Sequence, residues 1–287
     1  MPVYDRRYRG YEGERRPARR AIRSLVARGL AEVFASRLTI LLLVVAALPT
    51  LGFGGVLYVA NNLAAFAAVG VDPGRGFIAI DANFFFTFLV VQSSFAFLVA
   101  AFVGPTLVAP DLAHNGLVLY LSRPLSRTGY VIGKAAILVI LLSVLTWVPG
   151  ELLLLLQSTL ASGWAAANAG LFGALFGASA LWIAVLTLFA LAISAWVRWR
   201  PFATAMLFLV FVVGKGLGHA VMAILATRWG QLLIVDDLIR NLWRWLFTRE
   251  AGEGNLSVSA SAVALVAFGL LAIWMLSKKI RPVEVSR

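Results

Sequence analysis

The chain of 287 residues is strongly apolar and carries a formal net charge of +12. Hydrophobic residues make up 61% of it and charged residues only 13%, and the mean hydropathy is +0.89. A soluble domain carries about 45–50% apolar and about 25% charged residues, so this composition excludes a water-soluble globule. The basic residues gather at the N-terminus, between apolar segments and at the C-terminus, which indicates membrane topology rather than nucleic-acid binding. The lack of cysteine excludes disulfides, a thiol nucleophile and a Cys-based zinc site.

Residues 1–37 are predicted to form a cytoplasmic basic arm and an interfacial helix. This segment contains ten arginines. From about Pro17, apolar side chains recur at helical spacing while basic side chains fall largely on the other side. The pattern is typical of an amphipathic helix on an anionic membrane surface, where each basic residue contributes roughly 1 kcal/mol. A short solvated arm is the alternative interpretation.

Six later segments are long and apolar enough to cross a bilayer, which takes about 20 helical residues. The fold class is therefore predicted to be all-α, a polytopic membrane protein with a six-helix transmembrane domain over residues 38–276. The predicted spans lie near residues 38–60, 83–109, 131–157, 171–197, 202–224 and 257–276. Residues 277–287 are predicted to form a cytoplasmic basic tail.

The segment before the last span, residues 226–254, is too polar to cross the membrane, yet its apolar residues recur at helical spacing. Within it, Asp236 and Arg240 are placed to pair at i,i+4. Its tryptophans suit the membrane–water boundary: Trp229, Trp243 and Trp245. We therefore predict an amphipathic extracellular helix at the interface rather than a seventh span.

The distribution of basic residues predicts the orientation of the chain. With the N-terminus in the cytoplasm, 19 of the 25 Lys and Arg residues lie on the cytoplasmic side and five on the other, with Lys215 inside a span. Cytoplasmic segments of membrane proteins carry an excess of Lys and Arg. We therefore expect a multi-pass protein of the plasma (inner) membrane with both termini in the cytoplasm.

The link between the second and third spans, residues 110–130, is the most informative part of the sequence. Asp111 is predicted to begin a short helix, because a carboxylate is favourable near a helix N-terminus. Pro124 ends this helix, since the residue before a proline avoids the helical region, and Ser126 then caps the third span. A helix, a stop and a second helix in so few residues predict a fixed cytoplasmic projection.

This link resembles the corresponding segment of the permease subunits of ATP-binding-cassette (ABC) transporters of the exporter-like type 2 group. Those permeases carry an acidic residue, a Gly with a Leu-rich turn, a Pro, a small polar residue with Arg, an aromatic residue and Gly-Lys. The matching residues are Asp111, Gly116, Leu117, Leu119, Leu121, Pro124, Ser126, Arg127, Tyr130, Gly133 and Lys134. The chain departs from the pattern in having Asp where Glu is commoner, and His114-Asn115 where a basic residue often lies.

The resemblance implies that the link is a coupling helix, which docks in a groove of a cytosolic ATPase. It implies that this contact involves Asp111, His114, Asn115, Leu119, Arg123, Pro124, Arg127, Tyr130 and Lys134. It also implies export as the direction and pairing as a homodimer or with a related permease. The chain lacks a Gly-x-x-x-x-Gly-Lys-Ser/Thr loop, so ATP and Mg are expected on a separate ATPase chain, with no cofactor or catalytic residue on this one. An ordinary basic loop is the alternative interpretation of the link.

Charged residues inside spans are costly and tend to mark function. Glu151, Lys215 and His219 are the candidates for a substrate path or a buried ion pair, and a position at the outer mouth is the alternative. The second span is rich in Phe and suits an apolar or amphipathic cargo. Two other functions compete with a permease: a membrane-embedded enzyme, for which the chain has no His-Glu-x-x-His motif, and a non-transporting anchor for a cytosolic complex.

Overall fold

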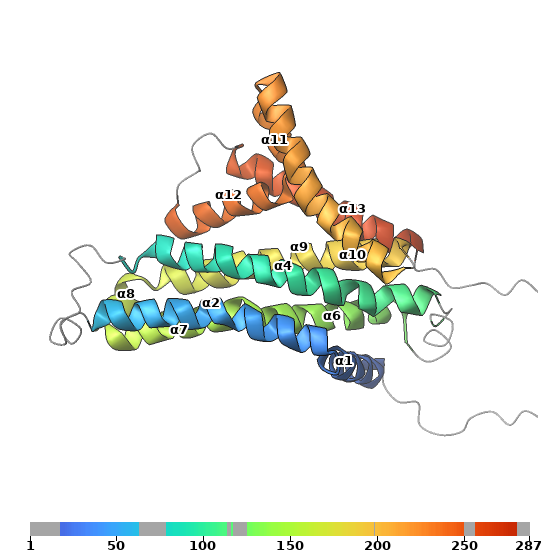
Figure 1. Ribbon diagram of the computed structural model, residues 1–287, viewed down its shortest axis with the longest axis horizontal. Coiled ribbons are helices and arrows are strands. Elements are labelled where there is room, and N and C mark those ends of the chain that lie inside the picture. Colours follow the sequence, from blue (N-terminus) through green and yellow to red (C-terminus); the bar gives the residue numbers. More distant parts are fainter. Residues whose placement is uncertain are drawn as a thin grey trace, which may run out of the picture.

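The protein is seen in a computed structural model that describes residues 18–62, 79–113, 116, 125–197, 199–249 and 256–279. Within these residues the chain forms helices and no strand. Most of the helices run along one common axis (Figure 1), and six helical segments of the described part are long and apolar enough to cross a membrane. The predicted all-α polytopic fold is confirmed.

The six spans follow the predicted segments to within a few residues. They are α2 (Arg37–Asn61), α4 (Ala82–Ala113), α6 with α7 (Arg127–Leu145 and Trp147–Leu160), α9 (Gly170–Trp196), α10 with η1 and α11 (Arg200–Phe208, Leu209–Val213 and Gly214–Leu225) and α13 (Val258–Lys279). The shorter helices are α1 (Ala18–Phe34), α8 (Trp164–Ala167), η2 (Arg228–Leu233) and α12 (Val235–Thr248).

Helices α4 and α9 form the centre of the bundle. In their most apolar stretches, 50% and 61% of the residues are buried inside the protein, against 11% in α2 and 17% in both α10–α11 and α13. The outer helices expose large apolar side chains such as Leu51 and Val263. An apolar surface of this extent is unfavourable in water, so we infer that these faces meet lipid.

Helix α1 lies across one end of the bundle and is seen nearly end-on in Figure 1, where α2 runs horizontally across the picture. Ser36 separates the two helices and caps α2. The apolar face of α1 packs on α6 at Gly133, where an added Cβ would lie 2.6 Å from Leu25 and 3.7 Å from Ile22. The predicted amphipathic helix is therefore present, and part of its apolar face is covered by α6.

The third span is interrupted at Thr146, between α6 and α7. The φ and ψ angles of this residue, −109° and −85°, leave the helical region, and its hydroxyl donates to the carbonyl of Leu142 at 2.8 Å. Pro149 follows in the first turn of α7, where a missing N–H leaves no helical hydrogen bond unmade. The interruption therefore lets the span continue past the proline.

Helix α4 is tied to its neighbours where Pro105 interrupts its hydrogen bonds. Pro105 has no N–H, so the carbonyl of Ala101 lacks its helical donor, and it accepts a hydrogen bond from Thr204 of α10 at 3.0 Å. The hydroxyl of Ser194 in α9 accepts from the N–H of Ala109 at 2.9 Å and donates to the carbonyl of Pro105 at 3.4 Å. Neighbouring spans thus satisfy these backbone groups, as a lipid environment requires.

Candidate functional site

Helix α4 continues to Ala113, so Asp111 does not begin a new helix. The prediction that Asp111 is the first residue of a short helix is wrong, because the carboxylate lies in the last turn of α4. Pro110 precedes it, and the second span was predicted to end just before this proline, near residue 109. The turn persists past this proline because two side chains of α6 bind the Asp111 carboxylate.

Asp111, Tyr130 and Lys134 form a polar cluster between the end of α4 and the start of α6. The Nζ of Lys134 lies 2.8 Å from Oδ2 of Asp111, and the Tyr130 hydroxyl donates to the same oxygen at 2.6 Å. The side chains of Lys134 and Asp111 are 9% and 18% exposed, and Tyr130 is fully buried. Charges this poorly solvated require partners, and short charge-assisted hydrogen bonds are the strong ones. The cluster therefore fixes both ends of the link.

The other residues expected at an ATPase contact are divided between the described and undescribed parts of the chain. Outside the described residues lie His114, Asn115, Leu119, Arg123 and Pro124. Arg127 is exposed at the first residue of α6. Ser126 caps that helix as predicted, accepting a hydrogen bond from the N–H of Gly129 at 3.0 Å. The link thus re-enters the bundle at a capped helix start with an exposed cation beside it.

A second charged cluster lies where the fifth span leaves the bundle. Beyond α10 this span stands at an angle to the others (Figure 1), and a π-helical turn, Leu209–Val213, joins α10 to α11. Such turns re-aim the side chains around them and are frequent at functional sites. Just after the turn, the Nζ of Lys215 lies 3.3 Å from Oδ2 of Asp236 in α12. The same oxygen lies 2.9 Å from Nη2 of Arg240, which confirms the predicted i,i+4 pair.

Helix α12 packs into the bundle against α4, α9 and α13. The predicted amphipathic helix is present, but its apolar stripe is covered by protein. Trp243 is 1% exposed, and its indole N–H donates to the carbonyl of Ala178 in α9 at 2.8 Å. The prediction that Trp243 lies at the membrane–water boundary is wrong, because its ring fills the space beside Trp182, with 6.0 Å between ring centroids. Trp229 and Trp245 are exposed.

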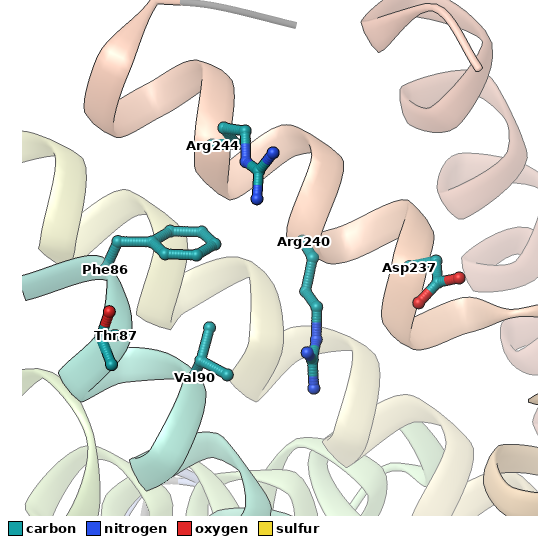
Figure 2. A pocket seen from close by; sticks show the side chains of 6 residues that line it. All are labelled: Phe86, Thr87, Val90, Asp237, Arg240 and Arg244. Atoms are coloured by element: carbon teal, nitrogen blue, oxygen red, sulfur yellow. The ribbon is translucent and has the colours of Figure 1, made fainter. Parts of the chain in front are cut away.

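Arg240 lines two neighbouring cavities beside α12. The first, about 360 Å³ in volume, also reaches Trp182 near the midpoint of α9. The second has a volume of about 270 Å³ and is shown in Figure 2, where Arg244 lies above Phe86 and Arg240 extends beside Val90. The guanidinium of Arg244 lies 5.7 Å from the ring centroid of Phe86, within the range of a cation–π contact. Charged side chains of α12 therefore line cavities, one of which extends to the middle of α9.

Comparisons with known proteins do not assign the chain to a family. No protein-family profile matches the sequence, and no curated protein matches it. Within the described ranges, no group of three or more His, Asp or Glu side chains is placed to hold a metal ion. The function is therefore inferred from the arrangement of the chain's own residues.

The three candidate residues for a substrate path do not converge. Glu151 lies in α7 and Lys215 lies in α11. Figure 1 shows these two helices on opposite sides of the bundle. His219, one turn beyond Lys215, is exposed. Sequence analysis missed Asp236 as the partner of Lys215, because the two residues lie 21 positions apart and α12 was expected at the outer surface. An ionised residue in a span predicts that a counter-charge exists, but not which element supplies it.

Two glycines bring α11 and η2 into backbone contact. A Cβ added to Gly218 would lie 2.7 Å from the carbonyl oxygen of Gly230, whereas nothing lies within 4 Å of Gly216 on the same helix. We expect Gly218→Val to cost about 1–3 kcal/mol, as overpacking does, and Gly216→Val to cost much less. Thermal unfolding of both purified variants in detergent measures the difference. Equal shifts in Tm would contradict the close approach of the two helices.

Proposed function

We propose that the chain is the transmembrane permease subunit of an ATP-driven ABC transporter of the type 2 group. The proposed protein is an exporter of the plasma (inner) membrane, with both termini in the cytoplasm. The observation that supports it best is the anchored link: Asp111 at the end of the second span binds Tyr130 and Lys134 at the start of the third. A link fixed at both ends passes a displacement to two spans, whereas a free loop absorbs it.

The contacts around Pro105 extend this route into the bundle. Ser194 and Thr204 join α4 to α9 and α10 close to its Asp111 end. In the proposed mechanism, a cytosolic ATPase binds ATP and Mg and moves the link, and α4 carries the movement to the central spans. Helix α1, seated on α6 at Gly133, moves with them. Two copies of the chain, or one copy and a related permease, complete the transporter.

The proposal is tested by capturing the partner ATPase. Arg127 is exposed at the start of α6, and Arg200 is exposed at the start of α10, at the same end of the bundle (Figure 1). We expect the tagged chain, solubilised from its native membrane, to co-purify an ATP-hydrolysing subunit. Arg127→Glu should reduce the recovered ATPase by about tenfold, equivalent to about 1.4 kcal/mol, while Arg200→Glu, the matched control, should leave it unchanged.

Each outcome of the capture experiment has a defined meaning. Loss of the ATPase with Arg127→Glu alone supports docking at the link. Equal losses with both variants contradict docking at the link and indicate a general effect of charge. Absence of any ATPase from the wild-type preparation contradicts the permease proposal and favours a self-contained membrane enzyme or a membrane anchor.

A further inference from the structure

Arg240 is a partly buried cation, 38% exposed, with unfilled hydrogen-bonding capacity between α12 and α4. Its Nη2 pairs with Asp236, but its Nε is buried and has no hydrogen-bond partner among the described residues. Asp236 cannot fully neutralise Arg240, because the same carboxylate oxygen also binds Lys215. A buried N–H of a charged group without an acceptor is unfavourable. The buried Nε of Arg240 therefore lacks an acceptor among the described residues, and a ligand with an anionic oxygen would provide one.

The formal charges around Arg240 lead to the same conclusion. Asp237 and Arg244 line the adjoining cavity (Figure 2). Together with Lys215, Asp236 and Arg240, these side chains carry three positive charges and two negative ones. One positive charge is left over beside the apolar spans, where the side chains of Arg240 and Lys215 are 38% and 41% exposed and Arg244 is exposed. A single anionic group would compensate for it.

An aromatic wall adjoins the charged side chains. It is formed by Phe97, Trp182, Phe208 and Phe211, whose contacting rings have centroids 5.0–5.8 Å apart. Such rings offer a large apolar surface. Ser94 and Val212, which also line the cavity, are exposed, so the cavity opens on the outside of the bundle between α4 and η1.

We propose that this cavity, between α4, α9, η1 and α12, binds the anionic headgroup of a membrane amphiphile. Arg240 is the principal ligand, because its planar fork suits a phosphate or carboxylate in a bidentate contact. Lys215 then retains Asp236, and the aromatic wall holds the start of an acyl chain. The volume of about 360 Å³ falls in the usual range for small-molecule sites. In the proposed permease this amphiphile is the transported cargo. Its role as cargo rests on the proposed function, whereas its binding at this cavity does not.

Binding is measured on the purified full chain in mild detergent by native mass spectrometry. Three probes separate the sources of an anionic group: phosphatidylglycerol for a phosphodiester, oleate for a carboxylate, and phosphatidylcholine as the zwitterionic control. We expect at least one anionic probe to bind more tightly than phosphatidylcholine. Arg240→Gln should weaken that binding by about tenfold or more. Arg240→Lys should weaken it less, because lysine keeps the positive charge but lacks the planar guanidinium.

Two controls keep the test specific. Arg228→Gln makes the same change at an exposed cation of η2 and should leave binding unchanged, and an unaltered Tm for Arg240→Gln shows that the variant is folded. If Arg240→Gln unfolds, the proposal is tested on the wild-type protein. It is then overturned if the wild type does not prefer the anionic probes to phosphatidylcholine. Equal binding by folded Arg240→Gln and wild type also overturns it. Because the assay contains no ATPase, anionic binding without ATPase capture would contradict the permease while supporting this site.

Discussion

Replacement of Lys134 by methionine should destabilise the protein by roughly 3–5 kcal/mol, the usual cost of removing one partner of a buried ion pair. The Asp111 carboxylate has two donors in the described residues, Lys134 and Tyr130. The substitution removes Lys134, so the carboxylate stays poorly solvated and retains only the Tyr130 hydroxyl. The same change at Lys278, which is exposed in the last turn of α13, should alter stability by less than about 1 kcal/mol, because it loses only an exposed contact with the Trp274 ring. Thermal unfolding of the three proteins in one detergent measures both effects.

A paired replacement separates the loss of charge balance from the loss of packing. Asp111→Leu combined with Lys134→Met removes both charges and retains apolar bulk, and such exchanges are often neutral or stabilising. The double variant should therefore regain most of the stability that Lys134→Met loses. If the double variant is as unstable as the single one, repacking rather than an unpaired charge is responsible. Wild-type stability of the single variant would contradict the buried pair itself.

The spans were predictable because each contains an apolar stretch of the length that a bilayer requires. Their details depended on contacts that a local pattern does not show. The second span was predicted to end near Ala109, because a short polar segment follows it, yet α4 continues to Ala113 and α6 supplies partners for Asp111 in this last turn. The interruption at Thr146 also went unpredicted, since it depends on a backbone conformation three residues before Pro149.

The charged cluster on α12 was only half predictable. The spacing of Asp236 and Arg240 predicted their contact, because residues four apart share one face of a helix. The contact with Lys215 depends on how α12 returns to the bundle. An amphipathic stripe has the same sequence pattern whether its apolar side meets lipid or protein. For this reason the interfacial prediction placed Trp243 at the boundary, whereas α9 covers it.

Truncation of Trp243 should distinguish these two placements of α12. Trp243 is 1% exposed and donates a hydrogen bond to Ala178, so Trp243→Ala should cost about 3–5 kcal/mol, as for other large aromatic residues in a core. Trp245, two residues further along the same helix, is 39% exposed, and Trp245→Ala should cost less than about 1 kcal/mol. Thermal unfolding in detergent measures both costs.

A more conservative change isolates the hydrogen bond. Trp243→Phe keeps an aromatic ring but loses the indole N–H, and we expect a cost between those of the two alanine variants. Loss of the hydrogen bond in Trp243→Phe should also let α12 shift. Because α12 carries Asp236 and Arg240, this variant should bind anionic lipid more weakly. Equal Tm values for Trp243→Ala and Trp245→Ala would instead place α12 on the surface, where an amphipathic pattern alone would put it. In that case the cavities beside Arg240 would lose the helix that forms them.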